Sequence, residues 1–267
     1  MVQAPAEFGV ELVVVNRTGG SGAAALAYAA GKPKDGHTLL LVTQTHILTM
    51  IRSKTPTQFA DLVGIARATE DPQVLLVRKD SPLRTKEDLL KAGKERALKV
   101  GITNIGGTDH VALASFAKTI GIRMPTAVPF RGGADIAINI VGGNIEAGLV
   151  NPGETDAQIR AGEVRGLLAM SEKRLPSMPD TPTAREVGID AVYATSRGFA
   201  VLKGTPEDRI AKLEEGLIKS MQGQMFQAFL TNSGQSPDSV AGRAVWQAQL
   251  DRTNAEAKQI LPELGLI

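Results

Sequence analysis

Short polar and glycine-rich segments follow several stretches that have the composition of buried strands. Such segments can bind an anion, because glycine lets a backbone N–H approach a ligand and a following helix adds the partial positive charge of its N-terminus. In open α/β sheets, ligands bind at the carboxyl ends of the strands. We therefore predict a carboxylate or phosphate site. The candidate ligand-binding residues are Thr43, Gln44, Thr103, Asn104, Gly106, Gly107, Thr108, Arg131, Gly132, Asn151, Glu154 and Arg197.

Two arginines of this set, Arg131 and Arg197, can clamp a carboxylate, because a planar guanidinium donates two parallel hydrogen bonds to it. Each can equally serve a salt bridge. An α/β enzyme acting on a carboxylate substrate is the alternative, with His110 or Glu154 as its general base. His110 also suits a polar place in the first turn of a helix, and Glu154 suits a cap on the helix after it.

The sequence lacks the residues and motifs that several other kinds of site require. The chain has no cysteine, and its three histidines have no metal-binding spacing, so we expect neither a metal nor a cofactor. The phosphate-loop, dinucleotide and nucleophile-elbow motifs are absent. With 30 Lys and Arg against 28 Asp and Glu, the 267 residues carry no basic footprint for nucleic acid. The longest aliphatic run, Leu39–Val42, is too short to insert into a membrane.

The elements that must position the candidate residues alternate between short apolar runs and longer helical stretches, which is typical of an α/β fold. Apolar residues on consecutive positions suit strands buried on both faces, as in parallel sheets. The expected strands are Glu11–Val15, Thr38–Val42, Gly64–Ala68, Val74–Arg78, Lys99–Ile102, Ala127–Phe130, Ala147–Val150 and Gly166–Met170. The expected helices are Gly22–Ala30, Lys86–Ala92, His110–Thr119, Ala134–Gly142, Asp156–Ala161 and two long helices after Gly204.

Six segments follow one another in a recognisable order. They are VVVNRTGGSG at 13–22, KDGHTLLL at 34–41, GGTDHVA at 106–112, VPFRGG with VGGNIEA over 128–147, KRLP with PTAREVG over 173–188, and RGF at 197–199. Together they resemble the motifs of the tripartite tricarboxylate transporter receptors, also called Bug proteins. The resemblance covers essentially the whole chain.

This resemblance implies a two-domain periplasmic-binding-protein-like α/β fold (type II) with a hinged cleft. Residues 1–98 and 199–267 would form domain one, and residues 99–198 would form domain two. The implied function is that of a periplasmic solute receptor without catalytic activity. Its partners would be a small organic carboxylate, resembling a di- or tricarboxylate, and the membrane subunits of a transporter.

The beginning of the chain departs from the family pattern. Family members start with a further strand and a glycine-rich loop, whereas only twelve residues precede Val13 here, and they do not read as a signal peptide. We therefore expect this strand–helix unit to be missing, which would weaken the binding of carboxylates. The strand expected at Glu11–Val15 would then lie at a sheet edge or pair with a second copy.

Overall fold

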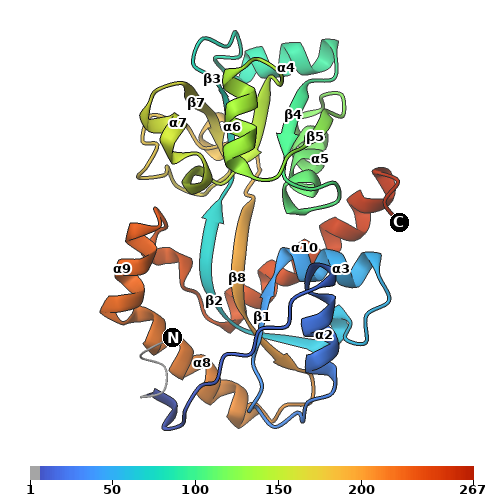
Figure 1. Cartoon of the computed structure of the whole chain (residues 1–267), viewed down its shortest axis with the longest axis vertical. Helices are drawn as coiled ribbons and strands as arrows, with labels where there is room; N and C mark the ends of the chain where they lie inside the picture. Colours follow the sequence, from blue (N-terminus) through green and yellow to red (C-terminus); the bar gives the residue numbers. More distant parts are fainter. Residues whose placement is uncertain (1–6) are drawn as a thin grey trace. The chain divides into compact units, whose positions relative to one another are not determined.

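The computed structural model describes residues 7–267, which form two compact units (Figure 1). Unit 1 comprises the described residues through Glu70 together with Ser196–Ile267, and unit 2 comprises Asp71–Thr195. The chain passes from one unit to the other inside two strands, β2 (Leu62–Pro72) and β8 (Ala194–Leu202). Each unit has its own sheet.

Unit 1 contains a three-stranded sheet in the order β1-β8-β2, with β1 (Leu40–Thr43) antiparallel to β8. Trp246 is fully buried against Leu26 and Leu250, as its apolar setting predicts, and its indole N–H donates to the Phe199 carbonyl. The helices of this unit are η1 (Gly20–Gly22), α2 (Ala23–Ala30), α3 (Gln44–Arg52), η2 (Phe59–Asp61), α8 (Glu207–Gln222), α9 (Gln224–Asn232), η5 (Pro237–Ser239) and α10 (Arg243–Glu263).

Unit 2 contains a five-stranded mixed sheet in the order β5-β4-β6-β3-β7. The three strands β5 (Thr126–Pro129), β4 (Lys99–Ile102) and β6 (Ala147–Val150) are parallel. The strand β3 (Val74–Arg78) runs antiparallel to β6 and to β7 (Val164–Ala169). The helices of this unit are α4 (Lys86–Glu95), α5 (Thr108–Ile120), α6 (Gly133–Val141), η3 (Pro152–Glu154), α7 (Asp156–Arg160) and η4 (Arg185–Val187).

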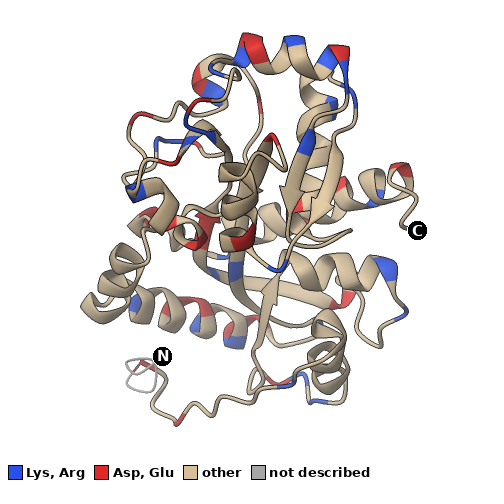
Figure 2. Ribbon diagram, turned by 45° about the horizontal axis from the view of Figure 1, so that its top comes forward, with Lys and Arg blue, Asp and Glu red and all other residues tan. Residues whose placement is uncertain are grey.

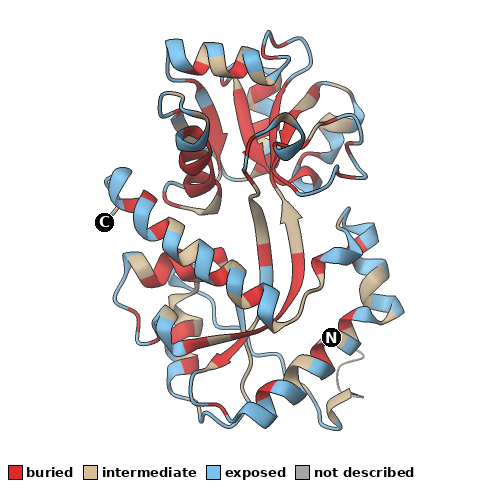
Figure 3. Ribbon diagram, turned by 180° about the vertical axis from the view of Figure 1, so that it is seen from behind, coloured by how far each residue is buried: buried red, intermediate tan, exposed pale blue. Residues whose placement is uncertain are grey.

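Both faces of the unit 2 sheet are covered. Along β3, Leu75 and Val77 pack in an apolar cluster with side chains of α4 and α5. The alternate residues Val74 and Leu76 pack in a second cluster with α6, as the two-residue period of a strand requires. Figure 3 shows these strands as buried, beside helices whose outer faces are exposed.

Most of the predicted elements are present. The bounds of β3, β4 and β6 are those predicted, and β1, β5 and β7 are shifted by one or two residues. The strand expected at Glu11–Val15 is wrong: these residues have no regular secondary structure, and Val13 is 75% exposed. Because a strand needs a hydrogen-bonded neighbour, β-branched residues alone do not make one. The residues of α3 and β8 were not among the predicted elements.

Parallel pairing, which buried strands of this kind suggest, holds for β5, β4 and β6 but not for β3, which is antiparallel to both of its neighbours. The segment from Asp71 to Leu98, expected in domain one, lies in unit 2, because β3 forms the sheet there between β6 and β7. The first division of the chain thus falls at 70/71 rather than at 98/99, and the second at 195/196 rather than at 198/199.

The surface helices carry charges of both signs. Figure 2 shows Lys and Arg interspersed with Asp and Glu along α4 and along α8. Among residues 7–267, no helix combines the length and the apolar character that a membrane crossing requires.

Replacing Gly198 with alanine should destabilise unit 1. A Cβ atom at Gly198 would lie 2.5 Å from Trp246 Cε2 and 2.6 Å from the Ala66 carbonyl oxygen, and neither neighbour can move freely. Overpacking of this kind costs about 1–3 kcal/mol of unfolding free energy. Urea unfolding followed by Trp246 fluorescence measures the effect. Gly142→Ala is the control, since its nearest neighbour would lie at 3.4 Å; equal stabilities of the two variants would contradict the prediction.

Candidate functional site

Three of the predicted segments meet at one edge of the unit 2 sheet. They follow β4, β5 and β6, whose carboxyl ends point the same way because the strands are parallel. The Phe130 N–H donates to the Ile102 carbonyl (2.8 Å), which joins the first two segments. The Gly133 N–H donates to Glu154 Oε2 (3.0 Å), which joins the second and the third. The predicted convergence is therefore present within unit 2.

The segment between β4 and α5 is held by its own side chains. Asp109 accepts hydrogen bonds from the backbone N–H of Thr103 and of His110. The imidazole Nδ1 of His110 accepts from the Gly106 N–H (2.9 Å), and both Asp109 and His110 are buried. Gly106 has a φ of 71°, in the left-handed region that glycine tolerates. His110 thus fixes the backbone of the segment.

At the N-terminus of α5, the third N–H, that of His110, donates to Asp109, and the cap residue gives no side chain to the first two. Gly107 occupies the cap position and has no side chain that could accept the first N–H groups. An intrahelical partner is missing for the first N–H groups of any helix, so those of Thr108 and Asp109 remain for a ligand. Asn104 and Thr108 are accessible beside them. This helix end can bind an anion through neutral donors.

The N-terminus of α6 is already occupied by a carboxylate of the protein. Glu154 accepts the Gly133 N–H there, so it caps α6 rather than the helix that follows it. Gly132 precedes this turn with extended backbone, and a Cβ atom on it would meet nothing within 4 Å. Arg131 is exposed and makes no salt bridge within residues 7–267. Its guanidinium is thus available to an anion.

Asn151 serves the frame of unit 2. Its amide Nδ2 donates to the Asp71 carbonyl (2.7 Å), and its Oδ1 accepts from the Thr195 hydroxyl (3.1 Å). Asn151 is buried, and it ties the end of β6 to the two strands that leave the unit. The side-chain amide of Asn151 is therefore engaged in structural hydrogen bonds.

The remaining candidates, Thr43, Gln44 and Arg197, lie together in unit 1. Thr43 and Arg197 are cross-strand partners of β1 and β8. The Ser196 N–H donates to Gln44 Oε1 (2.9 Å), so β8 also holds the first residue of α3. Arg197 is exposed and forms no salt bridge with another described residue. Residues about 150 positions apart in sequence are thus adjacent in unit 1, and their part in ligand binding stays a prediction.

His46 is a residue that the sequence analysis missed. Its Nδ1 accepts from the Thr43 N–H (3.2 Å) and lies 3.2 Å from the Thr43 hydroxyl, so it forms a capping box at the start of α3. The threonine three residues before a polar side chain was the available signal. The ring packs against Gly22, and burial lowers the pKa of His46 below its usual 6.5. His46 is therefore neutral at pH 7.

Unit 1 should lose stability through His46 as the pH falls. Below pH 6.5 the unfolded chain protonates this histidine while the folded chain does not. The unfolded state then binds more protons, so the free energy of unfolding decreases from the unfolded pKa down to the folded one. Melting temperatures of wild type and of His46→Asn, whose amide oxygen replaces Nδ1, should converge between about pH 7.5 and pH 5.5. His37→Asn, at an exposed position, is the control. Parallel curves for wild type and His46→Asn would refute the assignment.

The described residues contain no group of three or more side chains suited to a metal ion.

Residues 3–266 of the chain match a family described as tripartite tricarboxylate transporter family receptor. A UPF0065 protein of Bordetella pertussis is 25% identical over 97% of this chain and 81% of its own length. A second UPF0065 protein, from Pseudomonas sp. strain P51, is 30% identical over 80% of this chain and 65% of its own length.

Solved structures share the fold. A solute-binding protein from Polaromonas superposes with a TM-score of 0.88 and 30% identity over 98% of this chain and 90% of that one. A Rhodopseudomonas palustris protein with adipate gives 0.71 and 23%, and another with bound malate gives 0.67 and 22%. They cover 99% and 96% of this chain, and 90% of each of theirs. The last two matches show similarity of fold.

Proposed function

Because the chain belongs to the tripartite tricarboxylate transporter receptor family, we propose that it binds a small organic carboxylate and presents it to the membrane subunits of a transporter. The observation that carries this proposal is the N-terminus of α5, where Gly107 gives no side chain to the Thr108 and Asp109 N–H groups, at the edge where three segments of unit 2 meet. The proposed location is the periplasm.

The chain is a receptor rather than an enzyme, as its family and its similarity to a solute-binding protein show. The enzymatic alternative rested on His110 or Glu154 as the base. Both side chains hold backbone N–H groups instead, those of Gly106 and Gly133. Each is therefore explained by its role in shaping the segments around it.

The ligand chemistry follows from the groups that remain available. The N–H groups of Thr108 and Asp109, the Thr108 hydroxyl and the Asn104 amide are neutral donors, and Arg131 adds a positive charge. Such a set suits an ionised carboxylate, because charge-assisted hydrogen bonds are about twice as strong as neutral ones. The two structures of similar fold that hold adipate and malate support a dicarboxylate.

Within unit 2, the proposed direct contacts of the ligand are thus Asn104, Thr108, Arg131 and Gly132. Thr103, Gly106 and Gly107 remain in the proposed site as the backbone that shapes it, because their N–H groups already donate to Asp109, to His110 and to the Asn104 carbonyl. Asn151 and Glu154 act behind them, since each is already hydrogen-bonded to the backbone or to a neighbouring side chain. Within unit 1, Thr43, Gln44 and Arg197 stay proposed ligand-binding residues, since β1 and β8 bring them together.

Calorimetric titration with malate, adipate and their diamides tests the proposal. The diacids should bind and the diamides should not, because the neutral donors of α5 and the Arg131 guanidinium favour a negative charge. Over the range where the ligand stays ionised, the affinity should change little with pH. Equal affinity for an acid and its diamide would overturn the proposal.

Arg131→Gln should weaken the binding of malate or adipate roughly tenfold or more, since a hydrogen bond to a charged group contributes about 1.5–3 kcal/mol. Arg123→Gln is the matched control: it removes the same charge from an exposed residue of unit 2 whose guanidinium donates to the Lys94 carbonyl. If both variants bind as wild type does, Arg131 is not a ligand contact.

A further inference from the structure

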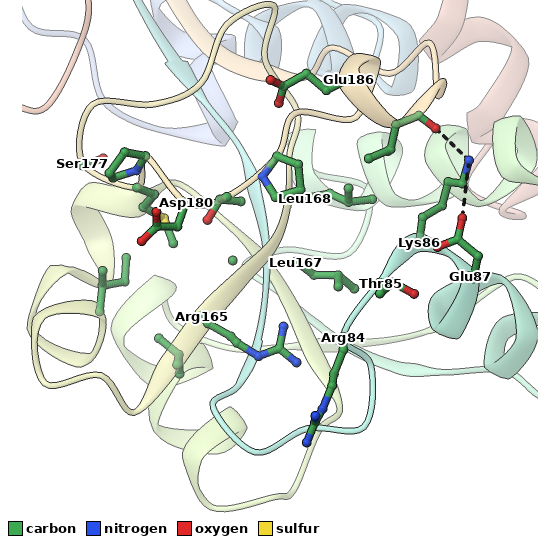
Figure 4. Close-up of a pocket in the computed structure, with 18 residues that line it drawn as sticks. Arg84, Thr85, Lys86, Glu87, Arg165, Leu167, Leu168, Ser177, Asp180 and Glu186 are labelled. Carbon is green, nitrogen blue, oxygen red and sulfur yellow. Dashed lines mark hydrogen bonds and ion pairs between the residues drawn. The ribbon is translucent and has the colours of Figure 1, made fainter.

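A cavity of about 820 Å³ lies in unit 2, apart from the candidate carboxylate residues. Its walls come from the start of α4, the strand β7, the end of α7 and the proline-rich segment Ser177–Pro182. None of the candidate ligand-binding residues lines it. Figure 4 shows the cavity beside the strand that carries Arg165 and Leu167.

The cavity follows the free edge of a sheet. The strand β7 is last in the order β5-β4-β6-β3-β7, and β3 is its neighbour on the inner side. On the outer side, the described chain pairs with β7 only at its end, where Ala169 donates to the Pro182 carbonyl and accepts from the Ala184 N–H. The outer edge from Val164 to Leu168 is thus left without a neighbouring strand in residues 7–267.

The direction of the free backbone groups follows from the pairing. The Lys79 N–H donates to the Glu163 carbonyl (3.0 Å), so Glu163 faces β3. Successive residues of an antiparallel strand face opposite sides, and the N–H and carbonyl of Val164 therefore point outward. A row of such groups is a template for one more strand.

Two layers flank this edge. On one side, Leu167 and Leu168 pack in the same apolar cluster as Leu89 of α4. On the other side, Val164 packs in the second cluster with Met178. A Cβ atom at Gly166 would lie 2.3 Å from the Thr181 hydroxyl oxygen, so the proline-rich segment presses on that face. The cavity is a slot between layers, with the sheet edge as its floor.

Positive charge gathers on the α4 side of the slot. Arg165 donates to the carbonyls of Lys79, Ser81 and Leu83, which fix its guanidinium without a carboxylate in contact. Burial lowers the pKa of Arg165 and the charge of Arg84 lowers it further, whereas the nearby carboxylate of Asp88 acts in the opposite direction. In Figure 4, the Arg165 side chain extends toward the segment of Arg84, whereas Asp180 lies across the strand.

Three carboxylates also line the slot, those of Glu87, Asp180 and Glu186, and two of them are already engaged. Glu87 lies 3.9 Å from the Lys86 ammonium at the start of α4. Glu186 accepts from Arg174 and from the Thr183 N–H. An anion beside Arg84 and Arg165 would thus meet two guanidinium groups that make no contact with a carboxylate among the described residues.

We propose that this slot binds an extended acidic segment of a partner protein, which adds to β7 as a further strand. Alternate side chains of an added strand point to opposite layers. Acidic side chains would face Arg84 and Arg165, and apolar side chains would face Met178 and Ile159. Main-chain hydrogen bonds give affinity in this mode of binding, and the alternate pockets give specificity.

The test uses the full chain and a fluorescently labelled peptide of alternating valine and glutamate, followed by anisotropy. A peptide of alternating valine and lysine and a valine–glutamate peptide with N-methylated alternate amides are the probe controls. The acidic peptide should bind, with an affinity that falls as salt rises. Both control peptides should bind about tenfold more weakly or worse.

Three variants locate the contact. Arg84→Glu should lower the affinity for the acidic peptide about tenfold, because it reverses a charge in the slot. Lys91→Glu makes the same charge change on the exposed side of α4 and should leave binding unchanged. Val164→Pro removes an outward N–H at the first residue of β7, a place where proline is tolerated, and should also weaken binding. Circular dichroism checks that it folds, and the N-methylated peptide tests the same bond without altering the protein.

Three results would overturn the proposal. One is equal affinity for the acidic peptide and the lysine peptide. Another is an Arg84→Glu variant that binds the acidic peptide as tightly as wild type does. The third is competition by malate or adipate at the Arg84-dependent site, since it would mark a small-anion pocket. Concentration-dependent dimerisation that Arg84→Glu abolishes would instead assign the slot to a second copy.

Discussion

The buried guanidinium of Arg67 holds the strands β2 and β8 of unit 1 in place. It is 7% exposed, and burial lowers its pKa. The cost of burying this charge is offset by Glu70 at 2.6 Å, by Gln249 of α10 and by two carbonyls near η5. Gln249 also donates to the Ser196 hydroxyl, and the Ser196 N–H donates to Gln44. One desolvated charge thus connects β2, β8 and α10 to the candidate residues at the start of α3. Removing a partner would leave the charge uncompensated, which is more costly than losing the pair as a whole.

Local patterns predicted the elements that depend on local physics. The bounds of β3, β4 and β6 follow from short runs of buried aliphatic residues. Thr85 and Asp88 form the capping box at the start of α4 that their spacing predicts. The errors arise where contacts with residues distant in sequence determine the local structure. Val13–Val15 has high β propensity but no neighbour to pair with, and β8 contains Gly198, which weakens the strand signal. That glycine is needed because Trp246, 48 residues later in the chain, packs on its Cα.

The sequence likewise predicted one part of the candidate site and not another. The sequence indicates which segments follow strands, and the parallel order of β4, β5 and β6 brings three of these segments to one edge. It does not indicate which polar side chains the fold itself uses. Asn151 and Glu154 have the residue types of ligand contacts, yet their hydrogen bonds go to the Asp71 carbonyl and the Gly133 N–H. Such partners depend on the register of the strands, and register is set by long-range pairing.

The N-termini of α5 and α6 at this edge therefore have different roles. The N-terminus of α6 is closed by the Glu154 carboxylate, so a ligand anion placed there would meet a like charge. At α5 the carboxylate of Asp109 lies close as well, but it is turned back on the Thr103 and His110 N–H groups. Those bonds engage both of its oxygens, and Gly107 adds no side chain of its own. An incoming carboxylate can then gain the helix-terminal N–H groups, while Arg131 from the neighbouring segment offsets the negative charge of Asp109. In the proposed site, discrimination between anions rests on the spacing of backbone donors, which is fixed by buried side chains rather than by flexible surface charges.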